Sequence, residues 1–204
     1  MDHSQIISSF VALFVIIDPI GLAPLFVALT KGMTASHRRA IAIRACLLSF
    51  FLLLLFGVLG EAVLKFMGIS MPAFRIAGGI LLFLTALDML FERRTQRRRN
   101  QASAADDPSV FPLATPLIAG PGAITTIILL TDKASGSLAA ELVIFAVLAA
   151  VIGLVMAAFL LAGLFERALG ATGTNVVTRL LGMLLAALSV QFVVDGIETL
   201  IRAG

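Results

Sequence analysis

The sequence has few charged side chains and only one cysteine, and each shortage excludes a class of protein. Charged residues make up 13% of the 204 residues, whereas a soluble domain carries about 25%. The chain therefore lacks the polar side chains needed to cover a water-facing surface. The single cysteine, Cys46, excludes an intrachain disulfide, and its apolar surroundings indicate a small buried side chain.

In place of charge, the sequence contains long apolar runs. Hydrophobic residues make up 60% of the chain, and a helix needs roughly 20 of them to cross the ~30 Å hydrocarbon core of a bilayer. We predict an all-α polytopic membrane protein with six transmembrane helices, short loops and no separate soluble domain. The predicted spans are 5–30, 40–65, 71–92, 109–131, 138–165 and 175–202.

Motifs for catalysis and nucleic-acid binding are missing as well. The sequence has no phosphate-binding glycine loop, no His-Glu-x-x-His pair and no Cys-x-x-Cys pair. Its two histidines, His3 and His37, fall near the predicted membrane surfaces, and neither shares a span with Cys46. We therefore predict that the protein is not an enzyme and has no cofactor, metal site or nucleic-acid partner. The arginine run at 93–99 is interpreted as a topology signal.

Lysine and arginine are distributed unevenly between the two predicted sides of the membrane. One side carries nine: Lys31, Arg38, Arg39, Arg93, Arg94, Arg97, Arg98, Arg99 and Arg167. The other carries three: Lys65, Lys133 and Arg202. Because basic loops favour the cytoplasm, both termini are expected on the non-cytoplasmic side of the membrane.

The two halves of the sequence contain a repeated pattern. In each half a glutamate precedes a glycine by seven residues, and an arginine further on precedes another glycine by three. The matching residues are Glu61, Gly68, Arg75 and Gly78, and Glu166, Gly173, Arg179 and Gly182. An odd number of spans per half inverts one half relative to the other, as in many secondary transporters. We predict a first repeat at 1–92, a cytoplasmic linker at 93–108 and a second repeat at 109–204.

Proline and glycine interrupt the first and fourth spans at matching positions. The first break is Asp18-Pro19-Ile20-Gly21, and the second is Gly120-Pro121-Gly122-Ala123. Proline removes a backbone donor and glycine relaxes the backbone, so both spans are predicted to be discontinuous. Paired broken helices mark the substrate site of many transporters, and their unpaired N–H groups suit a carboxylate. Simple structural kinks are the alternative.

Asp18 is the strongest candidate for chemistry. A carboxylate near the middle of a bilayer costs several kcal/mol, so it is expected to bind a substrate amine, coordinate sodium or take up a proton. Capping of the following half-helix is a compatible structural role. Thr125 and Thr126 follow the second break, and either could hydrogen-bond a solute or its own helix backbone.

Other polar residues within the spans carry weaker predictions. Arg75 and Arg179 are expected to snorkel to the interface or to take part in gating. Asp88 and Asp195 are expected to be solvated. The remaining groups that could line a cavity are Thr85, Ser189 and Gln191.

The segments "DPIGLAPLF" in span one and "PLATPLIAGPGAI" in span four resemble the motifs of the MarC family. That family includes SnatA-like neutral amino acid transporters and belongs to the LysE-like transporter superfamily. The resemblance covers essentially the whole chain. It implies six spans in a bacterial-type inner membrane and transport of small neutral amino acids such as glycine and alanine. Leu22 and Thr115 depart from the asparagine and methionine that many relatives have there, so specificity could differ.

The leading hypothesis is a gradient-coupled secondary transporter of a small zwitterionic solute, with proton or sodium coupling at Asp18. The predicted substrate site comprises Asp18, Pro19, Ile20, Gly21, Gly120, Pro121, Gly122, Ala123 and Thr125. The alternatives are an ion or proton channel or exchanger that uses Asp18, and a non-transporting membrane protein. Substrate identity, coupling ion and transport direction stay open. The many small residues permit a homo-oligomer as readily as a closely packed internal core.

Overall fold

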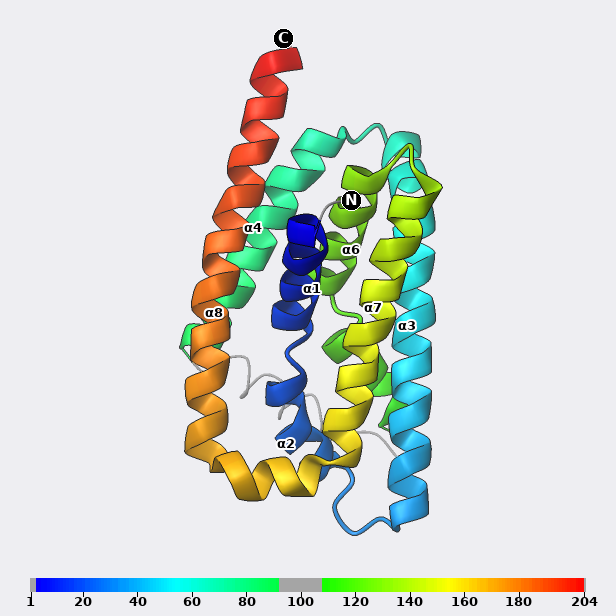
Figure 1. The fold of residues 1–204 in the computed structure, drawn as a ribbon, viewed down its shortest axis with the longest axis vertical. Coiled ribbons are helices and arrows are strands. Elements are labelled where there is room, and N and C mark those ends of the chain that lie inside the picture. The colour runs from blue at the N-terminus through cyan, green and yellow to red at the C-terminus, as the bar shows by residue number, and fades with distance from the viewer. Residues whose placement is uncertain (1–2, 92–107, 204) are drawn as a thin grey trace.

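The computed structural model describes the backbone of residues 3–91 and 108–203, which is helical apart from short turns (Figure 1). The elements are α1 (His3–Ile17), α2 (Pro19–Leu29), α3 (Ala35–Phe66), α4 (Met71–Leu90), η2 (Ser109–Ile118), α6 (Pro121–Ala134), α7 (Leu138–Leu160) and α8 (Ala162–Ala203). Within the described residues, five segments are long and apolar enough to span a membrane, and the bent pair η2–α6 makes a sixth. The all-α polytopic prediction is confirmed.

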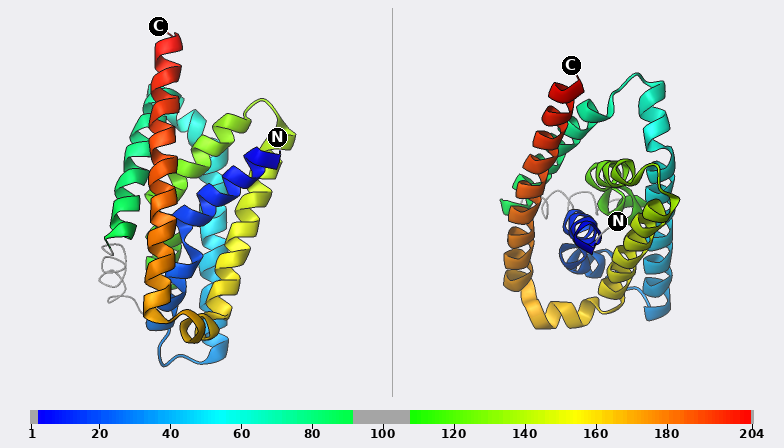
Figure 2. Two further views of the ribbon diagram at one scale, coloured as in Figure 1. Left: turned by 60° about the vertical axis from the view of Figure 1, so that its left-hand side comes forward. Right: turned by 45° about the horizontal axis from the view of Figure 1, so that its top comes forward.

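The first span lies at the centre of the bundle. In Figure 2, α1 and α2 pass between the α4–α8 pair on one side and α3 and α7 on the other. The span His3–Leu29 is also the most enclosed, with 61% of its most apolar window buried against 28% for Met71–Leu90. Any group at the middle of this span is therefore surrounded by protein rather than by lipid.

Side-chain caps set where several helices begin. Thr34 accepts a hydrogen bond from the His37 N–H (3.3 Å), so α3 begins at Ala35, five residues before the predicted start. Ser137 in the same way accepts from the Ala140 N–H (3.3 Å), and α7 begins at its predicted residue. These hydroxyls satisfy N–H groups that a helix start leaves unpaired.

The fifth span ends earlier than predicted. α7 stops at Leu160, and residues 162–169 run across the end of the bundle before the chain turns again at Gly170 (φ 59°, ψ −176°) (Figure 1). The prediction to residue 165 is wrong because apolar composition continues through the turn and carries no information on direction. The last span then covers Thr172–Arg202.

Some predicted features lie outside the described residues. The linker at 93–108 does so except for Pro108, and with it the arginine run at 93–99. The side chains of Glu166 and Arg167 are likewise not described. The orientation prediction and the division into two repeats therefore stay predictions.

Glycine residues bring α4 and α8 close together. A methyl group at Gly79 would lie 2.8 Å from the Ser189 carbonyl oxygen and 2.7 Å from Cγ2 of Val193. On α8, a methyl group at Gly182 would lie 3.0 Å from Met89 Cβ. Such small residues allow helix backbones to approach within a membrane, where packing replaces the hydrophobic driving force. The α4–α8 contact is the most extensive helix–helix contact among the described elements.

This packing predicts that Gly79→Leu destabilises the protein. The larger side chain must push apart two backbones, and overpacking of this kind costs about 1–3 kcal/mol. The control is Gly153→Leu on α7, where an added Cβ meets nothing within 4 Å. Thermal unfolding in detergent should show a lower midpoint for Gly79→Leu alone. Equal midpoints for the two variants would contradict the proposed close contact.

Candidate functional site

The break in the first span is made by Asp18. Its backbone is left-handed (φ 59°, ψ 65°), a conformation that aspartate tolerates better than most residues. The Asp18 N–H still donates to the Phe14 carbonyl (2.9 Å), and the Asp18 carbonyl accepts from the Leu22 N–H (3.0 Å). One helix therefore ends and the next begins at the same residue, with Pro19 at the first position of α2.

The Asp18 side chain caps α2 and is fully buried (0% exposed). Its Oδ1 accepts a hydrogen bond from the Gly21 N–H (3.0 Å). The positive end of the α2 dipole faces this carboxylate and offsets part of the cost of its burial. The capping role expected as one alternative is therefore present, and the structure leaves any binding role of the same group untested.

Gly21 is required by this cap. A Cβ built at Gly21 would collide with the Asp18 carboxylate. Any other side chain at that position would force Asp18 out of its rotamer and remove the hydrogen bond to the helix start. The pair Asp18 and Gly21 thus forms one local unit, in which the glycine makes room for the carboxylate.

The break in the fourth span has a different construction. η2 ends at Ile118, Gly120 is extended (φ −84°, ψ 171°), and Pro121 begins α6. The two parts are bent by 55°. A Cβ at Gly120 would collide with the Pro116 carbonyl oxygen, so the backbone path requires glycine here. Among the described residues no side chain caps α6 at this point, in contrast to the carboxylate that caps α2.

The helices at the two breaks contact one another. A Cβ at Gly122, in the first turn of α6, would lie 2.8 Å from Cδ1 of Ile16 in the last turn of α1. Of the predicted site residues, Asp18, Pro19, Gly120, Gly122, Ala123 and Thr125 are buried, Ile20 and Gly21 are half-buried, and Pro121 is exposed. The structure therefore brings the end of α1 against the start of α6, on mostly buried backbone.

Two neighbouring threonines after the second break use their hydroxyls differently. Thr126 donates to the Gly122 carbonyl of its own helix (2.8 Å). Thr125 makes no such bond to another described residue; it is 6% exposed, and its methyl group packs where a Cβ at Gly78 would collide. Of the two hydroxyls, that of Thr126 is the one bonded to its own helix.

Ser49 is a buried polar group that the sequence analysis did not single out. It lies on α3 with 0% exposure, donates to the Ala45 carbonyl (2.7 Å) and lies 3.5 Å from the Ala114 carbonyl in η2. It therefore joins α3 to the irregular half of the fourth span. The signal available in the sequence was one serine inside an otherwise apolar stretch, on the same face as the buried Ala45 and Leu53.

Ion pairs tie together the end of the bundle where α1 begins and α6 ends. Arg75 donates to Asp132 (2.7 Å), and both side chains are largely buried. Lys133 pairs with Asp195 (3.1 Å), which also accepts from the Gln191 amide (2.7 Å). Asp195 is thus paired rather than simply solvated, which corrects the sequence prediction. Asp132 was missed, because no local spacing connects it with Arg75.

The other polar groups predicted to line a cavity are used within their own helices. Thr85 donates to the Leu81 carbonyl (2.9 Å), and Ser189 donates to the Ala186 carbonyl (2.7 Å). Both bonds are typical of hydroxyl groups within apolar helices. Arg179, by contrast, lies exposed on α8.

Two cavities lie at opposite ends of the bundle. One, of about 330 Å³, has a polar rim of serines from the start of α1 together with Lys133 and Gln191. The other, of about 350 Å³, lies where α2 and α7 end and α3 begins. Asp18 lines neither of them. The break in the first span therefore lies between the two cavities and is closed off from both.

Comparison with known proteins identifies the family of this chain. The model for "MarC family integral membrane protein" matches residues 3–201. The chain is 36% identical to a membrane protein of Aquifex aeolicus, over 96% of this chain and 94% of that protein. It is 37% identical to the membrane protein YvbG of Bacillus subtilis, over 97% and 96%. For the inner membrane protein YhgN of Escherichia coli the identity is 36%, over 96% and 97%.

No solved structure matches the chain. The family match and the relatives each extend over almost the whole length, and they include both interrupted spans. The protein is therefore an integral, multi-pass membrane protein, and it belongs to the MarC family.

Proposed function

We propose that this protein is a secondary active transporter of small neutral amino acids of the glycine and alanine type, or of similar small zwitterionic metabolites. The observation that carries the proposal is the buried carboxylate of Asp18 at a helix break, enclosed between cavities at the two ends of the bundle. A carboxylate held at this depth is costly. A site closed from both ends also suits alternating access better than an open pore.

The chemistry at the two breaks suits a zwitterion. The Asp18 carboxylate attracts an ammonium group, while the N–H groups in the first turn of α6 carry partial positive charge and suit a carboxylate. In the part of the chain that the structure describes, no side chain caps that helix start. Thr125 follows in the next turn with its hydroxyl.

Coupling to a proton or sodium gradient is proposed through the same carboxylate. The Asp18 carboxylate accepts a hydrogen bond from the Gly21 N–H, and an ionised carboxylate can accept up to about four hydrogen bonds. It could take up a proton or coordinate sodium together with backbone carbonyls near the break. A substrate ammonium and a coupling cation would then compete for, or share, one negative group.

The membrane arrangement belongs to the same proposal. We infer an inner-membrane location with both termini on the non-cytoplasmic side, supported by the charge bias in the sequence. The two halves at 1–92 and 109–204 are proposed to be inverted repeats joined by the linker at 93–108. What supports this is the occurrence of a break in the first helix of each half.

Transport by purified protein in proteoliposomes tests the function. Radiolabelled glycine and alanine should accumulate when a proton or a sodium gradient is imposed, and accumulation should stop when the gradient is collapsed. Protein-free liposomes are the control. If well-folded protein moves neither amino acid under either gradient, the substrate assignment is wrong. Ion flux without solute under the same conditions would instead favour a channel or an exchanger.

A further inference from the structure

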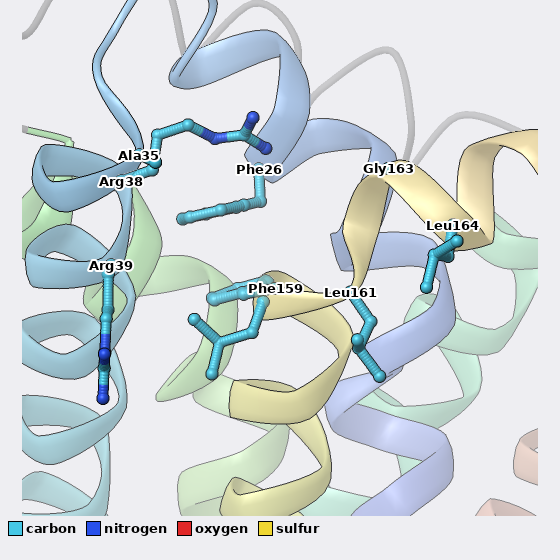
Figure 3. A pocket seen from close by; sticks show the side chains of 9 residues that line it. Phe26, Ala35, Arg38, Arg39, Phe159, Leu161, Gly163 and Leu164 are labelled. Carbon is cyan, nitrogen blue, oxygen red and sulfur yellow. The ribbon is translucent and has the colours of Figure 1, made fainter.

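The cavity at the end of the bundle away from the chain start has a different character from the central break. Figure 3 shows it from close by. It lies between the end of α2, the first turn of α3 and the turn from α7 into α8, and its volume is about 350 Å³. Its lining residues include two arginines, two phenylalanines and three leucines. Neither the family match nor the proposed transport function assigns a role to it.

One wall of this cavity is positively charged. Arg38 and Arg39 follow one another near the start of α3, and their side chains diverge (Figure 3). The Arg38 guanidinium lies over the Phe26 ring, 5.8 Å from its centroid, whereas Arg39 points along α3 away from that ring. Arg38 is half-buried and Arg39 is exposed. Among the described lining residues there is no carboxylate to neutralise them. The start of α3 adds the partial positive charge of a helix N-terminus.

The floor and the opposite wall are apolar. Phe26 and Phe159 are stacked with ring centroids 4.4 Å apart and planes 7° from parallel, and both are almost fully buried. At the rim, the leucines of the α7–α8 turn are exposed: Leu160 by 52%, Leu161 by 47% and Leu164 by 61%. In a membrane-spanning protein, exposed leucines beside a helix end face the lipid near the headgroup level.

We propose that this cavity binds an anionic phospholipid. The phosphate accepts hydrogen bonds from the Arg38 guanidinium, Arg39 adds a second positive charge to the same wall, and an acyl chain lies along the exposed leucines. Guanidinium groups match phosphate geometry with two parallel hydrogen bonds, and basic pockets between transmembrane helices bind lipid headgroups. A soluble phosphate would use the arginines alone, whereas a phospholipid uses both walls of the cavity.

Lipid binding to the purified protein tests this proposal without depending on transport. Native mass spectrometry would compare binding of phosphatidylglycerol and phosphatidylcholine to wild type and to Arg38→Gln/Arg39→Gln. We expect phosphatidylglycerol to bind more tightly and the double variant to lose roughly thirtyfold in affinity, since each basic group near an anionic surface contributes about fivefold. Lys31→Gln/Arg202→Gln removes the same charge outside the cavity and should bind like wild type.

Two further arms distinguish a lipid from a soluble anion. Leu164→Gln should weaken phosphatidylglycerol binding, and inorganic phosphate at the same concentration should not displace the lipid. The proposal is overturned if both lipids bind alike, or if the arginine double variant keeps the wild-type preference. It is also overturned if inorganic phosphate displaces the lipid while Leu164→Gln has no effect, because the cavity would then be a soluble-anion site.

Discussion

Asp18→Asn is expected to abolish gradient-driven uptake while leaving the fold intact. Asparagine tolerates the left-handed backbone at this position, and its amide oxygen can still accept the hydrogen bond from the Gly21 N–H. Only the negative charge is lost. If Asp18 binds a substrate ammonium or a coupling cation, uptake should fall by at least about 100-fold, because losing one partner of a buried charge pair costs about 3–5 kcal/mol.

Asp18→Ala separates the two roles of this residue. Alanine removes both charge and cap, and it is strained in the left-handed region, so it should also lower stability by about 1–3 kcal/mol. Uptake and thermal unfolding are measured on all three proteins. If the Asp18→Asn protein unfolds at the same temperature as wild type but does not transport, the result supports a binding role for Asp18. Wild-type uptake by the asparagine variant would show that Asp18 serves the fold alone.

Gly120→Ala is expected to damage the second break more than any comparable change nearby. The added methyl group collides with the Pro116 carbonyl oxygen, and a backbone atom cannot rotate away as a side chain does. The path between η2 and α6 must therefore shift, at a cost of about 1–3 kcal/mol. Because that path sets the direction in which the first N–H groups of α6 point, transport should fall as well.

Gly122→Ala and Gly153→Ala provide graded controls for this prediction. At Gly122 the added methyl group meets the end of the Ile16 side chain at 2.8 Å, which can move, so a milder effect is expected. At Gly153 it meets nothing within 4 Å. The thermal unfolding midpoint and the uptake rate should both be highest for Gly153→Ala, lower for Gly122→Ala and lowest for Gly120→Ala. A Gly120→Ala protein that behaves like Gly153→Ala would mean that glycine is not needed at the break.

The sequence was sufficient to locate the spans and both breaks, because their causes are local. Pro19 and Pro121 remove backbone donors, and Asp18 and Gly120 stand directly before them. Where a side chain had two possible hydrogen-bond partners, the sequence could not decide between them. The spacing of Thr125 and Thr126 fits a solute contact or a backbone bond equally, and only the packing against Gly78 and the bond to Gly122 separated them.

Interactions between distant elements could not be predicted. The ion pair between Arg75 and Asp132 joins residues 57 positions apart, and its partner choice depends on how α4 and α6 pack. The early end of α7 was hidden for a related reason, since residues 162–169 stay rich in apolar side chains while the chain changes direction. Hydropathy records how much of a segment is apolar, and it does not record where that segment points.

The α4–α8 pair has a consequence for how the chain is organised. The pair joins the third predicted span to the last one. Each of the two helices packs more extensively against the other than against any other described helix. Positive-φ glycines precede each partner, Gly68 before α4 and Gly170 before the spanning part of α8. A unit defined by packing therefore contains α4 from the N-terminal part of the sequence and α8 from the C-terminal part. The closest helix packing thus joins helices that are far apart in the sequence.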